Sequence, residues 1–320
     1  MKILIKTEGG KDIGFGHLTR CISIYQAFWE KKINPIFIIN NSSEAGNFLK
    51  DSKIEFVIDN GGKITSCDVL IIDSYLKPRY FYYETSKFVR LLVSIDDFNR
   101  LSYPSGLLIN GSIYAREIEY RKSRNLKYLL GPSYIPLRKS FWSIETKKIN
   151  QEVRNVLLTF GGFNYSFALK VARFLLKNFD FNLNAIFNRN ATNHPLFHNP
   201  KVRVFDNVSA EDMKKLMLNA DICISGGGQT TYELARCGVP TIGICFANNQ
   251  LLNLRGWQER GFIKYVGWFN DKNLYHKIKS SLLEMDYKTR LKMSQVGQRV
   301  VDGQGAIRVI REILTLSLIH

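Results

Sequence analysis

The feature that most constrains the fold is an order of elements that opens both halves of the chain: an apolar strand, a glycine turn and a helix. Residues 2–7 (KILIKT) predict a buried strand, followed by a glycine-containing loop at 8–16 and a helix over 17–31. The same order returns with a strand at 155–160 (NVLLTF), Gly161 and Gly162, and a helix over 165–178. Each half is therefore expected to build its own sheet.

Further apolar runs alternate with helical stretches along the whole chain. Predicted strands follow at 34–40, 54–58, 68–73, 90–95 and 106–110, and then at 181–187, 201–205, 221–225, 240–245 and 262–266. Predicted helices of the second half lie near 209–218, 229–237 and 249–259. Continuous apolar strands that alternate with helices predict an α/β fold with parallel sheets covered on both faces.

The length of 320 residues suits two domains of about 150 residues each. A polar segment at 145–152 (ETKKINQE) lies where the pattern restarts, so we expect domains at 1–150 and 151–320. The last fifty residues lack strand signals and predict helices, with Gly303 and Gly305 as a break before the final one. Two Rossmann-like domains that face each other would place the carboxyl ends of both sheets around one cleft, where ligands of such sheets bind.

Several classes of protein are disfavoured by the composition. The apolar runs are far shorter than the roughly 20 residues of a membrane-spanning helix, and the first ten residues do not resemble a secretory signal. The five cysteines are odd in number and include no C-x-x-C pair, which favours reduced, mostly buried thiols over disulfides or a zinc site. We therefore expect a cytoplasmic enzyme.

The formal net charge of +17 is spread along the chain, with 23 basic against 15 acidic residues in 1–150 and 22 against 13 in the rest. Residues 116–148 hold nine basic and three acidic residues, which we interpret as a solvated face in preference to a lipid or nucleic-acid patch. No zinc finger, RNP-type signature or long basic arm is found, so nucleic-acid binding is not expected.

The first candidate site is Gly14-Phe15-Gly16-His17, at the turn from the first strand into the first helix. Glycines allow a tight turn and close approach to a ligand. A helix amino terminus is expected to lower the pKa of His17 and to favour the neutral imidazole that a general base needs. The alternative is a histidine that merely packs at a helix start. Thr19 replaces the third glycine of a dinucleotide fingerprint, and no phosphate-loop NTPase motif is present.

The second candidate site follows the strand at 221–225. Its residues, Ser225-Gly226-Gly227-Gly228-Gln229-Thr230-Thr231, open a helix, and they can present unpaired backbone amides to a diphosphate without a metal. Glu233, on the first turns of that helix, could accept both hydroxyls of a ribose. A plain flexible turn and an exposed glutamate are the alternatives.

Polar side chains follow three other predicted strands. Asn248, Asn249 and Gln250 carry amides that suit sugar hydroxyls or acetamido groups, or that cap a helix. Asp73-Ser74-Tyr75 and Asp96-Asp97 end strands of the first half. Because no third ligand lies at a readable spacing, we expect these carboxylates to bond loops or substrate and not a metal.

Together these motifs resemble the nucleotide-sugar hydrolases of pseudaminic acid biosynthesis, which are similar in fold to GT-B glycosyltransferases. The motifs, in chain order, are IGFGHLTRC at 13–21, IIDSY at 71–75, IDDFNR at 95–100, LLINGSIYA at 107–115, LLGPSYIPLRKSF at 129–141, FGG at 160–162, SGGGQTTYELARCGVPTI at 225–242, NNQ at 248–250 and VDGQGAIRV at 301–309. Their order and spacing over most of the chain carry the resemblance.

The resemblance implies hydrolysis of UDP-2,4-diacetamido-2,4,6-trideoxy-β-L-altropyranose, with inversion at the anomeric carbon and without a cofactor or metal. The residue roles that it implies are catalysis by His17, sugar binding by Gly14, Gly16, Tyr75, Asn249 and Gln250, and nucleotide binding by Gly162, Gly226, Gly227, Gly228, Gln229, Thr230 and Glu233. Asn164 stands where the family usually has an aspartate, which leaves a different sugar specificity or a transferase role open.

The main alternative is a GT-B glycosyltransferase that uses an acceptor hydroxyl in place of water. In that case the basic surface would support weak peripheral association with an anionic membrane. A noncatalytic nucleotide-binding module is the third possibility, and it would bind UDP without turnover. We expect a monomer whose partner is a small UDP-sugar.

Overall fold

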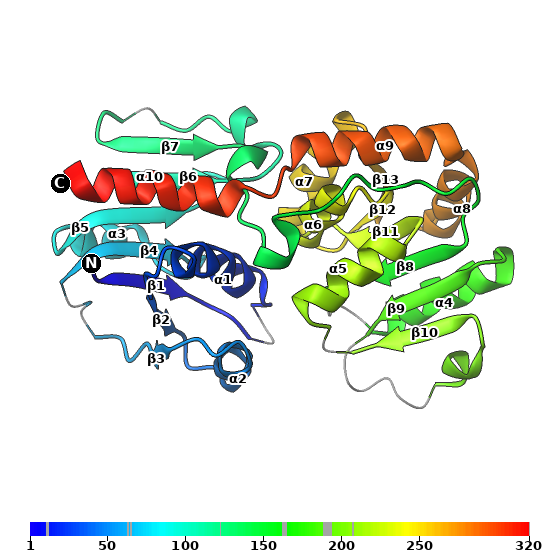
Figure 1. Cartoon of the computed structure of the whole chain (residues 1–320), viewed down its shortest axis with the longest axis horizontal. Coiled ribbons are helices and arrows are strands. Elements are labelled where there is room, and N and C mark those ends of the chain that lie inside the picture. The colour runs from blue at the N-terminus through cyan, green and yellow to red at the C-terminus, as the bar shows by residue number, and fades with distance from the viewer. Residues whose placement is uncertain are drawn as a thin grey trace. The chain divides into compact units, whose positions relative to one another are not determined.

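A computed structural model describes residues 1–10, 13–62, 64, 66–121, 123–161, 165–187, 194–206 and 208–319. The chain divides into two compact units (Figure 1). The first unit contains residues 1–142 and 303–320, and the second contains residues 143–302. Two parallel-sheet units confirm the α/β class expected from the sequence.

The first unit is a parallel sheet of seven strands in the order β3-β2-β1-β4-β5-β6-β7. Its strands are β1 Ile3–Thr7, β2 Ile36–Ile39, β3 Phe56–Ile58, β4 Cys67–Asp73, β5 Val89–Ile95, β6 Gly106–Asn110 and β7 Leu126–Leu130. Its helices are α1 Gly16–Trp29, α2 Ser43–Asp51, α3 Arg79–Ser86 and α10 Gly305–Ile319, with short 3₁₀ turns η1 Ala115–Glu117, η2 Pro132–Tyr134 and η3 Lys139–Phe141.

Helices cover both faces of this sheet. Successive side chains of a strand point to opposite faces, so Ile3 and Ile5 of β1 pack with α1 and α10, whereas Leu4 packs with Tyr82 of α3. Burial on both faces explains why β1 and β4 are continuous apolar runs and not alternating ones. The strand order matters for the site, because it places the carboxyl ends of β1, β4 and β5 side by side.

The final helix, α10, belongs to the first unit. It contacts α1, β4 and β5 (Figure 1). Its buried side chains Ala306, Val309, Ile310 and Ile313 lie in the same core as β1. The division therefore differs from the expected 1–150 and 151–320: it falls after residue 142, and the chain returns to the first unit at 303. The apolar side chains of α10 predict that this helix packs against a hydrophobic core. They do not indicate which of the two units provides that core.

Strand β7 was not predicted, because it lies in the basic stretch 116–148. Leu126 and Leu129 are buried and Lys127 is exposed, as suits a strand at the edge of the sheet. Two cations of this stretch pair with acids elsewhere in the unit: Lys127 with Glu312 at 2.7 Å and Lys139 with Glu30 at 2.6 Å.

The second unit is a parallel sheet of six strands in the order β10-β9-β8-β11-β12-β13. Its strands are β8 Asn155–Thr159, β9 Asn182–Ile186, β10 Val202–Phe205, β11 Ile222–Gly226, β12 Thr241–Cys245 and β13 Ile263–Trp268. Its helices are α4 Tyr165–Asn178, α5 Ala210–Asn219, α6 Thr230–Cys237, α7 Asn248–Glu259, α8 Leu274–Glu284 and α9 Tyr287–Val300, with a 3₁₀ turn η5 Pro195–His198.

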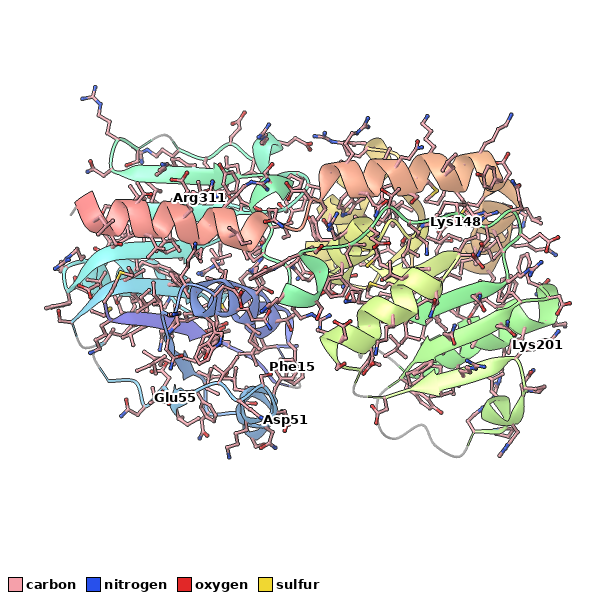
Figure 2. The ribbon with its side chains drawn as sticks, in the orientation of Figure 1. Phe15, Asp51, Glu55, Lys148, Lys201 and Arg311 are labelled. Atoms are coloured by element: carbon pink, nitrogen blue, oxygen red, sulfur yellow. The ribbon has the colours of Figure 1, made fainter. Side chains whose placement is uncertain are left out.

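The cysteines and the basic side chains are placed as the composition predicts. All five cysteines are buried and unbridged, as the sequence predicts. Basic side chains occur on both units, for example Arg311 on the first and Lys148 and Lys201 on the second (Figure 2). Among the described residues, no helix combines the length and the apolar character that crossing a membrane requires.

Candidate active site

His17 is the second residue of α1, just beyond the carboxyl end of β1. The chain turns between the two elements through Gly14, which has a φ of +80° and pairs with Gly10 in an isolated antiparallel bridge. Gly16 begins the helix, and a side chain at either Gly14 or Gly16 would meet no atom within 4 Å. The turn therefore leaves open space beside the histidine, although the His17 ring itself is largely buried.

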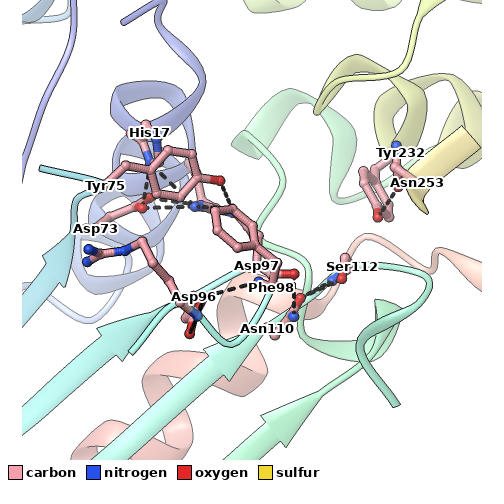
Figure 3. Close-up of polar contacts among 12 residues, drawn as sticks. His17, Asp73, Tyr75, Asp96, Asp97, Phe98, Asn110, Ser112, Tyr232 and Asn253 are labelled. Carbon is pink, nitrogen blue, oxygen red and sulfur yellow. Dashed lines mark hydrogen bonds and ion pairs between the residues drawn. The ribbon is translucent and has the colours of Figure 1, made fainter. Parts of the chain in front are cut away.

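The imidazole is held by a carboxylate. His17 Nδ1 lies 2.6 Å from Asp73 Oδ1, at the end of β4 (Figure 3). Burial opposes protonation of the His17 ring, but the charge of Asp73 and this hydrogen bond outweigh it, so the pKa of His17 is raised above 6.5. The lowering expected from the helix amino terminus is therefore wrong, because a nearby full charge acts more strongly than the helix dipole.

Asp73 is itself fully buried and remains ionised. Burial disfavours its carboxylate, yet the positive charges of Arg20 and His17 hold the pKa of Asp73 well below its usual range. An ionised Asp73 fixes the proton of the neutral ring on Nδ1. Nε2, which makes no hydrogen bond to any described residue, is then the nitrogen that can accept a proton.

Arg20, which was not among the candidate site residues expected from the sequence, joins the cluster from the same face of α1. Its guanidinium bonds Asp73 through Nε and Nη2, both at 2.8 Å. It also bonds Asp97 through Nη1 at 2.6 Å and Nη2 at 3.1 Å. Its spacing from His17 could have identified it, because an arginine three residues after a histidine lies on the same side of a helix.

Tyr75 closes the cluster. Its ring meets the His17 ring edge to face, with centroids 4.2 Å apart, and its hydroxyl donates to Asp97 Oδ2 (Figure 3). The neighbouring Asp96 instead accepts backbone N–H bonds from Phe98 and Arg100. Of the expected carboxylates, Asp73 and Asp97 thus build the cluster, and Asp96 shapes a loop.

In the second unit, the three glycines after β11 have different surroundings. Gly226 is the last residue of the strand. Gly227 packs against α7 so closely that an added side chain would meet Leu254 Cγ at 2.7 Å. Its N–H donates to Gln250 Oε1, which also accepts from the Phe246 N–H. The Gln250 oxygen therefore holds this loop in place, and the sugar contact expected for Gln250 stays a prediction.

Gly228 is the open part of the same loop. It is exposed, and a side chain there would meet nothing within 4 Å. Gln229 is the N-cap residue of α6 and Thr230 is its first residue, so the segment 228–230 lies at the positive, amino-terminal end of this helix. The segment 228–230 has the geometry that suits an anion.

The remaining predicted residues divide as follows. Glu233 lies on α6 and is buried, and Asn249 is exposed on the first turn of α7. Gly162 and Asn164 lie outside the described residues. The structure thus gathers His17, Tyr75, Gly14 and Gly16 at the start of α1 in the first unit, while the predicted nucleotide residues belong to the second.

A separate pocket of about 360 Å³ occurs in the first unit, between α3, the segment before β6 and the segment before β7. Arginine and tyrosine side chains, including Arg79, Tyr83 and Arg121, line it. None of the predicted site residues contributes to this pocket, so we do not assign the chemistry to it.

The fold is that of the GT-B glycosyltransferases. The structure of MurG from Acinetobacter baumannii matches with a TM-score of 0.70 and 12% identity, over 98% of this chain and all of that one. The glycosyltransferase VinC, solved in complex with dTDP, matches with a TM-score of 0.66 and 12% identity over the full length of both chains. At such identities these likenesses show the fold alone. No protein-family model matches the chain.

Three curated proteins are similar in sequence. An uncharacterized protein of Methanocaldococcus jannaschii, MJ1062, is 26% identical over 275 residues, which are 76% of this chain and 55% of that one. The Helicobacter pylori pseudaminic acid cytidylyltransferase and UDP-2,4-diacetamido-2,4,6-trideoxy-β-L-altropyranose hydrolase is 28% identical over 255 residues, 78% of this chain and 46% of that one. The Bacillus subtilis spore coat polysaccharide biosynthesis protein SpsG is 23% identical over 334 residues, 97% of this chain and 96% of that one.

The chain thus spans about half the length of the first two relatives and nearly all of SpsG. The resemblance read from the motifs is confirmed at the level of a GT-B-like chain that is similar to a pseudaminic acid biosynthesis protein.

Proposed function

We propose that this chain is a hydrolase that releases UDP from UDP-2,4-diacetamido-2,4,6-trideoxy-β-L-altropyranose or a closely similar UDP-sugar. The observation that carries the proposal is the His17–Asp73 pair, a buried imidazole whose Nδ1 proton is fixed by an ionised carboxylate. This pair occurs in a chain that is similar to a hydrolase of that UDP-sugar.

In the proposed reaction, His17 Nε2 takes a proton from water as the water oxygen attacks the anomeric carbon. The bond from that carbon to the diphosphate oxygen breaks, UDP leaves, and the configuration at the carbon inverts. The second unit binds the nucleotide, with Glu233 at the ribose. Backbone amides of segment 228–230 and the positive end of α6 stabilise the charge that grows on the diphosphate.

A proton acceptor in this position typically accelerates a reaction by about 100- to 10,000-fold. We therefore expect His17→Asn to reduce turnover by at least about 100-fold and to leave UDP affinity nearly unchanged. His276→Asn, which changes an exposed histidine on α8, is the matched control and should behave like the parent. Near-normal turnover in His17→Asn would remove this histidine from the mechanism.

A glycosyltransferase is the second candidate, because the solved structures that match include enzymes of that class. The same base would then deprotonate an acceptor hydroxyl. Incubation of the purified chain with the UDP-sugar and no acceptor separates the candidates, with UDP and free sugar followed by NMR. Equal release of both supports the hydrolase. UDP release only after an acceptor is added supports the transferase, and tight UDP binding without turnover in any pairing indicates a binding module.

A further inference from the structure

The charges around His17 do not balance while its ring is neutral. Asp73 and Asp97 share one guanidinium, that of Arg20, through four hydrogen bonds. Two carboxylates and one cation leave a net charge of minus one beside a neutral imidazole. The cluster becomes neutral when His17 gains a proton, which is the state that the ring reaches as water attacks in the proposed function.

We propose that Arg20 and Asp97 are positioning residues that set the protonation of His17 in opposite directions, with Arg20 favouring the neutral ring and Asp97 the protonated ring. Arg20 also holds Asp73 in the orientation that bonds His17 Nδ1. This inference adds two residues to the proposed function and rests on it for the role of the ring in turnover.

The geometry supports separate roles for the two residues. Arg20 is buried, and its Nη2 lies 3.5 Å from His17 Nδ1. Among the described residues, Asp97 makes no hydrogen bond to the ring; it is linked to the ring through Arg20 and through Tyr75, whose hydroxyl donates a hydrogen bond to it. In a buried site, unit charges at such distances act more strongly than they do in water.

The other titratable groups of the cluster are neutral at ordinary pH. Burial raises the pKa of the Cys21 thiol, whose sulfur lies 3.8 Å from Asp73 Oδ2. Burial also raises the pKa of Tyr75 well above its usual range and that of Tyr114, from the segment after β6, to about 12. Among the described residues, the charges with the largest effect on the His17 ring are those of Asp73, Arg20 and Asp97.

The test is a titration of the His17 ring by NMR in the full-length protein with labelled histidine. The chain has five histidines, and the spectrum of His17→Asn assigns the signal. Removal of a cation in Arg20→Gln should move the midpoint to higher pH, and removal of an anion in Asp97→Asn should move it to lower pH. The acid limb of the turnover profile, where the ring becomes protonated, should move in the same directions.

Arg20→Lys separates charge from geometry, because an ammonium keeps the charge but cannot bond both carboxylates with paired N–H groups. We expect a midpoint near that of the parent together with reduced turnover. If Arg20→Gln does not fold, the inference is still tested by the midpoint of Asp97→Asn and by the midpoint and turnover of Arg20→Lys.

Matched control residues, one acidic and one basic, lie on strands β4 and β5. Asp68 on β4 and Arg90 on β5 form a more exposed pair at 3.6 Å near the amino ends of these strands, away from the cluster. Asp68→Asn and Arg90→Gln change the net charge equally and should leave the His17 midpoint in place.

An unchanged midpoint in Asp97→Asn, or a shift to higher pH, would overturn the inference. Shifts equal to those of the controls would do so as well. Opposite ring shifts in a protein that releases no UDP from any UDP-sugar would instead retain the inference and reject the proposed function.

Discussion

A methyl group added at Gly227 would meet Leu254 Cγ at 2.7 Å and Gln250 Cβ at 2.9 Å, whereas one added at Gly228 would meet no atom within 4 Å. The two adjacent positions therefore have different steric surroundings. Gly227 allows α7 to pack against the loop, and Gly228 leaves open space at the exposed part of the loop. Sequence reasoning treated the three glycines as one anion-binding unit, because a glycine required by packing and one required by a ligand look the same in a sequence.

The pair gives a direct test. Gly227→Ala should lower the free energy of unfolding by about 1–3 kcal/mol, because it overpacks the contact with Leu254. Gly228→Ala should leave stability within about 0.5 kcal/mol and weaken UDP binding, because the proposed function places the diphosphate beside the new methyl group. Urea unfolding and calorimetric titration with UDP measure both effects. Unchanged UDP affinity in Gly228→Ala would argue against diphosphate binding at this loop.

At the scale of elements, the sequence predicts most strands because buried parallel strands are continuous apolar runs. The run NVLLT of β8 needs no tertiary information to be recognised. Strand β7 (LKYLL) is half exposed at a sheet edge and is masked by the basic residues around it. The partners of Arg20 could not be predicted, since they depend on β4 and β5 following β1 in the sheet, an order that local sequence does not encode.

The return of α10 to the first unit yields a prediction about one helix. Ile310 is buried in the core shared with β1, so Ile310→Ala should lower the free energy of unfolding by about 2–5 kcal/mol. Leu318 is 87% exposed near the end of the same helix, and Leu318→Ala is the control that should have little effect. Urea unfolding followed by circular dichroism compares the two. Equal, small losses would mean that α10 does not stabilise the first unit.

At the scale of the whole molecule, the charge of +17 at neutral pH means that every carboxylate protonated in acid adds to an existing positive excess. Several carboxylates oppose this excess within the fold. Asp59 lies 2.5 Å from the ammonium of Lys6, a buried residue of β1, and 3.1 Å from that of Lys77. Asp59 therefore couples acid titration to the stability of the first unit.

Burial opposes the ionised form of Asp59, but the hydrogen bonds from Lys6 and Lys77 outweigh it and lower its pKa to about 2. A folded pKa below the unfolded value of about 3.9 means that the stabilisation is complete above about pH 4 and is lost as pH falls through about 2.

Allowing for partial exposure, we expect Asp59→Asn to lower the free energy of unfolding by about 1–2 kcal/mol at pH 7. Urea unfolding at pH 7 and pH 3 should show a smaller difference from the parent at pH 3. Asp51→Asn, at the exposed end of α2 (Figure 2), should show no such change, and a difference for Asp59→Asn that is the same at both pH values would contradict the assignment.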